Sequence, residues 1–349
     1  AMPNYLGDGS IRPVVNITYG VNELDRNWSV GLASNPRYRP WEREKETEDI
    51  SSEPIERGIE TEQRDFTSMN LNGRYEQRFP GGSRLQVNGL AQWSDNDRER
   101  REVLFDPSLS DGIRRFSDIL EDEARDTYFA EVTADYSYPI GNNSTFTVLG
   151  LYHWEEENKQ RDVFDILPLD EPQLAKEERL VTRTEKIFRG TLDQNLSQKV
   201  TFQLGLEGTL NIQKTNFDLN IRNGEVLEPV TIFNSDGTVK EYRAEGFTTL
   251  RWRPWATLET EFGVAVEASQ IKQSSIDVNS SRSLAFVKPT FSTYWDVTPQ
   301  DKLFFTIVRD VDQLDFGQFV ANITQTEQEL EAGNPDLNPV RSWDYQVGL

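Results

Sequence analysis

The residues of this chain that could do chemistry are mostly carboxylates at alternating positions, alongside one histidine and no cysteine. Glu259, Glu261 and Glu267 are spaced by even intervals, so on a β-strand they share one face and could offer oxygen ligands to a hard cation. We favour a polar wall for them instead. His153 lies between Tyr152 and Trp154, and we interpret it as a side chain of the same interior or its rim. A lone histidine without cysteine leaves little material for a catalytic triad, so we predict no catalytic residue, no metal site and no enzyme activity.

Composition narrows the class of protein further. The 349 residues carry a formal net charge of −22, which argues against nucleic-acid binding because phosphate recognition needs clustered Lys and Arg. Without cysteine there is no disulfide framework and no thiolate zinc site. Mean hydropathy is −0.66 and no apolar run is long enough for a transmembrane helix. A membrane is still compatible, because a barrel strand exposes only every second residue to lipid.

Apolar and polar residues alternate over most of the chain, and a period of two predicts β-strands. Between Tyr128 and Tyr138, for example, one face is aromatic or aliphatic and the other carries Glu131 and Asp135. The pattern predicts thirteen strands, near residues 12–20, 27–38, 65–79, 83–95, 127–138, 145–156, 183–195, 199–212, 241–253, 256–271, 282–297, 302–311 and from 342 onward.

The links between these strands alternate between short and long. Short links are expected at residues 80–83, 139–144, 195–198, 253–255 and 297–301, and long charged links at 95–126, 155–182, 213–240 and 311–341. Short turns at one end and long loops at the other are typical of an up-and-down outer-membrane β-barrel. We expect Glu121-Asp122-Glu123 and Glu155-Glu156-Glu157 to be solvated loop charges, and residues 113–124 have the spacing of a short helix.

The polar face of the predicted strands carries charge in mid-strand, whereas the apolar face is uncharged over about ten residues and ends in aromatic side chains. Such a face fits a lipid-facing band flanked by aromatic girdles, with the polar face lining a watery lumen. The predicted lumen-lining, ligand-contacting residues are Arg74, Glu131, Asp135, Glu207, Glu259, Glu261 and Glu267.

One local motif is more specific than the strand pattern. The stretch Glu331-Ala-Gly-Asn-Pro-Asp-Leu-Asn-Pro339 is a punctuated turn that leads into an alternating segment at Ser342. It resembles the Gly-Asn-Pro-x-Leu-x-Pro segment in the barrels of TonB-dependent outer-membrane receptors. The matching positions are Gly333, Asn334, Pro335, Leu337 and Pro339. The resemblance implies a 22-stranded barrel closed by a plug domain, and uptake of a scarce ligand with energy passed on by TonB.

We therefore expect residues 1–349 to form one all-β, antiparallel, incomplete transmembrane barrel domain, with about 13 of 22 strands and no plug domain. The expected location is the bacterial outer membrane, with lipid and lipopolysaccharide as partners. The resemblance adds TonB and a plug domain as partners, and the small-molecule ligand is unknown. No cofactor is expected beyond loosely bound divalent cations. The alternatives are a passive, cation-favouring porin-like channel and a soluble acidic β-sandwich or adhesin.

Overall fold

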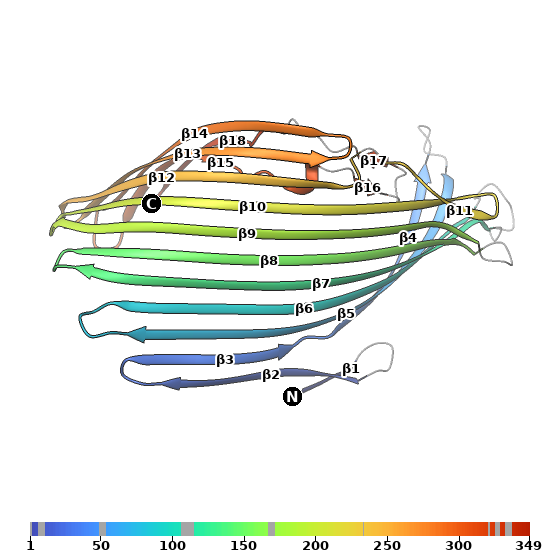
Figure 1. The fold of residues 1–349 in the computed structure, drawn as a ribbon, viewed down its shortest axis with the longest axis horizontal. Helices are drawn as coiled ribbons and strands as arrows, with labels where there is room; N and C mark the ends of the chain where they lie inside the picture. The colour runs from blue at the N-terminus through green and yellow to red at the C-terminus, as the bar shows by residue number, and fades with distance from the viewer. Residues whose placement is uncertain are drawn as a thin grey trace.

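One antiparallel sheet of 16 strands dominates the described part of the chain, in which each strand mostly pairs with its neighbours in sequence (Figure 1). The computed structural model describes residues 2–5, 11–48, 54–105, 115–166, 172–232, 234–319, 322–324, 329–331 and 337–349. The sheet order is β1-β2-β3-β5-β6-β7-β8-β9-β10-β12-β13-β14-β15-β18, with β4 paired to β5 and β11 paired to β10. This order confirms an up-and-down antiparallel topology, and between β1 and β18 the described sheet does not close.

The strand bounds confirm all thirteen predicted strands and add five in the described residues, β1, β4, β11, β16 and β17. The strands are β1 Met2–Tyr5, β2 Ile11–Asn22, β3 Arg26–Ser34, β4 Arg37–Glu48, β5 Pro54–Arg78, β6 Arg84–Phe105, β7 Arg115–Ile140, β8 Ser144–Asp165, β9 Gln173–Ser197, β10 Val200–Asn223, β11 Val226–Pro229, β12 Gly237–Trp255, β13 Leu258–Ser275, β14 Asn279–Asp296, β15 Lys302–Val311, β16 Asn322–Thr324, β17 Glu329–Glu331 and β18 Arg341–Gly348. A short 3₁₀ helix, η1, spans Phe316–Phe319.

The middle strands are longer than the sequence pattern predicted. β5 has 25 residues and β7 has 26, which at about 3.4 Å per residue gives roughly 85 Å, far more than a bilayer needs. Most of the predicted loops at 95–126 and 155–182 are therefore strand. The helix predicted at 113–124 is wrong. Residues 115–124 belong to β7, because every residue from Ser117 to Ala124 pairs with a residue of β6.

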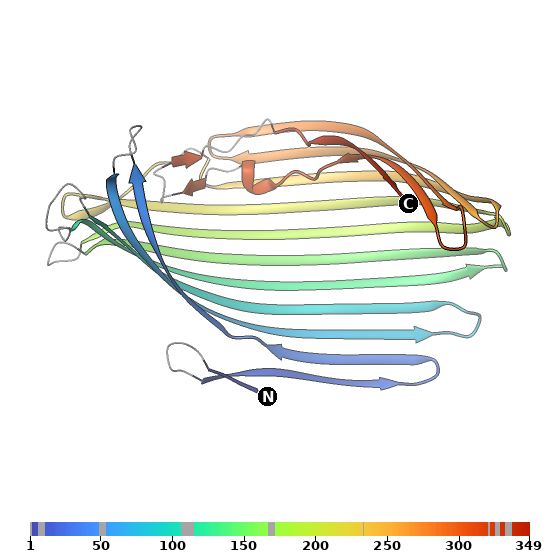
Figure 2. The same cartoon turned by 180° about the vertical axis from the view of Figure 1, so that it is seen from behind.

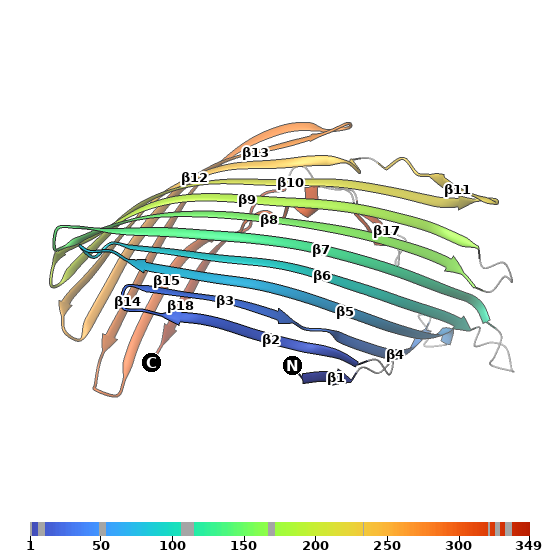
Figure 3. The ribbon, with the colours of Figure 1, turned by 60° about the horizontal axis from the view of Figure 1, so that its bottom comes forward.

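The sheet is curled, and its two faces differ in chemistry. Figures 2 and 3 show β14, β15 and β18 turning back at one end, so that one face is concave, and η1 lies on that side. On the convex face, Leu206 is 70% exposed, whereas the next side chain, Glu207 on the concave face, is 8% exposed. The aromatic side chains at the two ends of the apolar band, such as Tyr128 and Tyr138, are exposed as well. The apolar face is therefore not packed against a second sheet in the described residues.

Candidate functional site: the polar concave face

The seven predicted lumen residues lie on one face of the sheet. Cross-strand register places Glu131 opposite His153. It places Glu207 opposite Arg189 on one side and Glu245 on the other. Glu245 is in turn opposite Glu267. Because side chains alternate along each strand, these registers and those of β5–β7 and β12–β14 put all seven on the same side. The residues are Arg74, Glu131, Asp135, Glu207, Glu259, Glu261 and Glu267.

Most of these carboxylates have a basic partner from a neighbouring strand. Glu207 accepts from Arg189 at 2.5 Å and Glu261 from Arg251 at 2.9 Å. Asp135 is 3.7 Å from Arg84, Glu259 is 2.5 Å from Arg253, and Glu267 is 2.9 Å from Lys288. Arg74 lies 3.3 Å from Glu76 on its own strand. The wall is therefore a mosaic of ion pairs rather than a negative surface, a feature that inspection of the acidic residues alone did not reveal.

His153 forms the centre of a smaller polar group on β7–β10. Its Nδ1 is 3.4 Å from Glu131 and its Nε2 is 3.9 Å from Glu155. Glu155 also accepts from Arg183 at 2.5 Å, and Arg183 Nε donates to Gln213 at 3.3 Å. The prediction that His153 is an interior side chain agrees with this placement. Glu155, predicted as a solvated loop charge, instead lies on β8 within the polar face.

The chain folds inward after β15 and covers part of this polar face. Residues 313–316 and the β8–β10 wall, including His153, Arg183 and Gln213, enclose a hollow of about 250 Å³. At the end of this segment Phe319 is 1% exposed and packs with Val239 and Ile271. The carbonyl oxygen of Phe319 accepts hydrogen bonds from Asn234 at 2.9 Å and from Gln273 at 3.1 Å. We call residues 312–319 the inward segment.

The family-motif positions are only partly visible. Gly333, Asn334 and Pro335 lie outside the described residues. Leu337 packs against the Phe319 cluster, and its carbonyl accepts a hydrogen bond from Arg282. Pro339 immediately precedes Val340, whose carbonyl accepts from the Asp312 amide at 3.0 Å. The described end of the motif therefore contacts both ends of the inward segment, through Leu337 at Phe319 and through Val340 at Asp312.

A chain of ion pairs crosses the concave face at the long-loop end. Arg43 is 2.7 Å from Glu60, and Arg100 is 2.6 Å from Glu60 and 3.5 Å from Glu121. Arg161 is 3.1 Å from Glu121 and 3.8 Å from Glu177. Sign thus alternates from strand to strand. We call this set the ion-pair ladder; its members, in the order β4 to β9, are Arg43, Glu60, Arg100, Glu121, Arg161 and Glu177.

Every member of the ladder except Arg43 is buried, so the electrostatic interactions among these members are strong. Glu60, Glu121 and Glu177 are 3%, 8% and 2% exposed. Burial alone would raise the pKa of Glu60, but hydrogen bonds from Lys45, Arg43 and Arg100 lower it to about 2. The prediction that Glu121 and Glu123 are solvated is wrong, because both face the concave side; only Asp122 points outward and is exposed.

A sequence signal for the ladder was present. Same-sign residues occur two apart in successive strands, as in Glu60-x-Glu62, Arg98-x-Arg100 and Glu121-x-Glu123. Spacing of two places such a pair on one face of a strand, and the sign reverses from each strand to the next. Dense charge is typical both of loops and of strand extensions into water, so no single stretch identifies the cross-strand pairs.

No group of three or more His, Cys, Asp or Glu side chains in the described residues could hold a metal ion. No described helix is both long and apolar enough to cross a membrane.

Comparison with known proteins identifies a related fold but no sequence relative. No family model matches the chain, and neither does any curated protein sequence. A solved structure of the Serratia marcescens hemophore receptor HasR, a double mutant in complex with its hemophore HasA and heme, matches with a TM-score of 0.54 and 11% identity. The match covers 96% of this chain and 50% of HasR, so the chain spans about half of that receptor. The copper transporter OprC matches at a TM-score of 0.15 and 9% identity, over 84% of this chain and 73% of OprC, too weakly to bear on the fold. The chain is therefore an all-β protein whose antiparallel sheet has the fold of part of a large β-barrel.

Proposed function

We propose that this chain forms part of the wall of an outer-membrane receptor that captures a scarce ligand and passes it through a polar lumen. The observation that carries the proposal is the inverted distribution of side chains, with apolar residues exposed on the convex face and ion pairs buried on the concave face. In water, exposed apolar area costs about 25 cal/mol per Å². Against hydrocarbon the same face is favourable, and the polar face then surrounds enclosed water.

The orientation follows from the lengths of the strands. In outer-membrane barrels the short turns face the periplasm, so the ladder at the long-loop end would project outside the cell. Ligand would first meet this projecting wall and then the hollow beneath the inward segment, where Arg183, Gln213 and His153 present hydrogen-bonding groups. In this proposal lipid and lipopolysaccharide contact the convex face. The likeness to HasR, which was solved with a hemophore and heme, supports a receptor role, and the ligand here is unidentified.

The finer parts of the proposal rest on the sequence motif. The resemblance around Leu337 and Pro339 supports dependence on TonB and on a plug domain as partners. We propose no resident cofactor and no catalytic role; divalent cations would associate only loosely with exposed carboxylates. A passive cation-favouring channel is less well supported, because most of the candidate carboxylates have basic partners.

Cysteine labelling tests the proposal directly, since the chain contains no cysteine. Leu206→Cys places a thiol on the convex face and Gln203→Cys places one on the concave face of the same strand. In native membranes we expect a water-soluble maleimide to react severalfold more slowly at position 206 than at position 203. Equal rates, or a protein that stays monodisperse in buffer without detergent, would overturn the proposal.

A further inference from the structure

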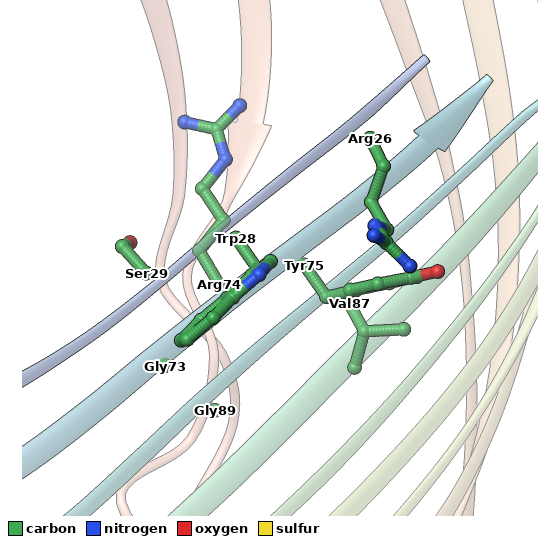
Figure 4. Close-up of a pocket in the computed structure, with 8 residues that line it drawn as sticks. All are labelled: Arg26, Trp28, Ser29, Gly73, Arg74, Tyr75, Val87 and Gly89. Atoms are coloured by element: carbon green, nitrogen blue, oxygen red, sulfur yellow. The ribbon is translucent and has the colours of Figure 1, made fainter. Parts of the chain in front are cut away.

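The convex face is not uniform, and one hollow in it lies near the short-turn end of β3, β5 and β6. It has a volume of about 550 Å³ and is bounded by the rings of Trp28 and Tyr75 (Figure 4). Gly73 and Gly89, which are directly opposite each other in the β5–β6 register, form its floor with Val87. Arg26 closes the end nearest the turn. We call this hollow the glycine groove.

The two floor glycines are not explained by the backbone or by crowding. Neither has a positive φ, so the conformation does not require glycine. A Cβ at Gly73 would meet only the Ser29 carbonyl oxygen at 3.9 Å, and one at Gly89 only the Glu131 carbonyl oxygen at 3.9 Å. Glycine inside a strand weakens it, and one common reason for its presence is the close approach of a ligand. The space above the floor is therefore the feature that these glycines provide.

The walls of the groove are aromatic and amphipathic. Trp28 is held by Tyr19, with ring centroids 5.5 Å apart in a T-shaped contact. The Tyr75 hydroxyl donates to Gln77 at 3.1 Å, which directs its polar tip toward the turn. Aromatic side chains of this kind are favoured where hydrocarbon meets headgroups. The groove thus has an apolar body and a polar end.

The charge at that end selects among lipids. The Arg26 side chain is 46% exposed, and its Nη2 donates a hydrogen bond to the Glu23 carboxylate at 2.8 Å. A guanidinium has five N–H donors, so this pair leaves donors with which a phosphate oxygen can also be bound. In a chain with a net charge of −22, a basic group at the polar end of an apolar groove is complementary to an anionic headgroup joined to an acyl chain.

From this geometry we infer that the glycine groove binds one anionic glycerophospholipid, with an acyl chain over Gly73 and Gly89 and its phosphate at Arg26. The inference rests on the proposed membrane location. At the short-turn end the lipid would belong to the periplasmic leaflet. Bound there, it fills a gap that the side chains of β5 and β6 leave in the lipid-facing surface.

Photo-crosslinking from one cysteine tests the inference. Leu71→Cys, two residues from the groove floor, and Leu206→Cys, on the convex face of the distant strand β10, are each labelled with benzophenone maleimide. The protein is placed in vesicles of nine parts phosphatidylcholine to one part phosphatidylglycerol. We expect phosphatidylglycerol to be enriched about fivefold in adducts at position 71, the effect of one basic residue near a lipid surface, and not at position 206.

Two variants test the phosphate end and the acyl-chain floor of the groove separately. In the Leu71→Cys protein, Arg26→Gln removes the phosphate contact and Gly73→Val fills the floor, and each should abolish the enrichment. Gly150→Val, a matched convex-face change where a Cβ would have no neighbour within 4 Å, should leave it intact. Equal lipid proportions at positions 71 and 206 would overturn the groove but not the proposed function. An absence of lipid adducts at both positions would overturn the membrane location itself.

Discussion

The concave face is stabilised in one way along β4–β9 and in another along β12–β14. Along β4–β9 the ion-pair ladder joins neighbouring strands, and its carboxylates are almost fully buried. Along β12–β14 the inward segment is docked by the apolar ring and the carbonyl of Phe319. Buried ion pairs fix the strand register, because a slip that separates the partners leaves an unpaired buried charge. An apolar anchor instead holds a segment that can detach locally. The two regions should therefore respond to different perturbations.

The largest expected effect is on the apolar anchor. Phe319→Ala leaves a cavity among Val239 and Ile271, so the inward segment should lose about 3–4 kcal/mol of docking free energy. Hydrogen exchange of the amides of residues 312–319 measures the loss, while the amides of β5–β9 should keep their protection. Phe316→Ala, a half-buried neighbour in the same segment, should cost less. Unchanged exchange in Phe319→Ala would show that the ring is not the anchor.

Removal of the central arginine of the ladder should cost slightly less. Arg100→Met leaves Glu60 and Glu121 without this shared partner, and we expect a loss of about 3 kcal/mol in the free energy of unfolding. Arg43→Met is the matched control: its side chain is 57% exposed, so the loss should stay below about 1 kcal/mol. Urea denaturation in detergent compares the two. Equal losses would mean that burial does not set the strength of the ladder.

Acid should weaken the ladder but not the apolar anchor. The pKa of Glu60 is lowered from 4.5 to about 2, so its contribution is complete above pH 4.5 and is lost as the pH falls toward 2. We expect a loss on the order of 2 kcal/mol across this window. Urea midpoints of the protein and of Glu60→Gln, taken between pH 7 and 2.5, should converge at low pH. A constant difference between them would contradict the assignment.

The smallest effect is expected on the outward-facing side of the same strands. Asp122 lies opposite Asp162. Partial burial, and after it the like charge of Asp162, raises the pKa of Asp122. Folding therefore favours the protonated form of Asp122 relative to the unfolded chain. At neutral pH, Asp122→Asn should stabilise the protein by only a few tenths of a kcal/mol, because most of the side chain is exposed and screened. The gain should disappear below the pKa of Asp122. A destabilised variant would show that Asp122 has a favourable partner.

Sequence periodicity was sufficient for the strands and for the faces they present. Alternation around Tyr128–Tyr138 and Leu258–Glu267 assigns each residue to a face, and cross-strand register agrees with it. Periodicity alone therefore places Glu131 and Glu267 on the correct face of the sheet. Their lumen role in the intact protein stays a prediction.

Periodicity failed where both faces are polar. Residues 95–105 and 115–126 lack an apolar face, so hydrophobic alternation could not reveal β6 and β7 there, and the charges suggested loops. What stabilises these extensions is pairing of opposite charges across strands, which a single segment does not display. The inward segment was missed for a related reason: Phe319 packs against Val239 and Ile271, far away in sequence, and local patterning carries no signal for such contacts.

The neighbour-to-neighbour order of the sheet has a consequence for how the wall is assembled. From β5 to β10, each hairpin aligns two consecutive segments, so the entropy of closing each connection is small and the growing edge always offers a template to the next segment. The pairing of β15 with β18 is different, because residues 312–340 intervene. We expect the pairing of β15 with β18 to be the slow, late step of folding. Burial of Phe319 beside β12 and β13 should speed this pairing, because it fixes one point of the connection against the sheet.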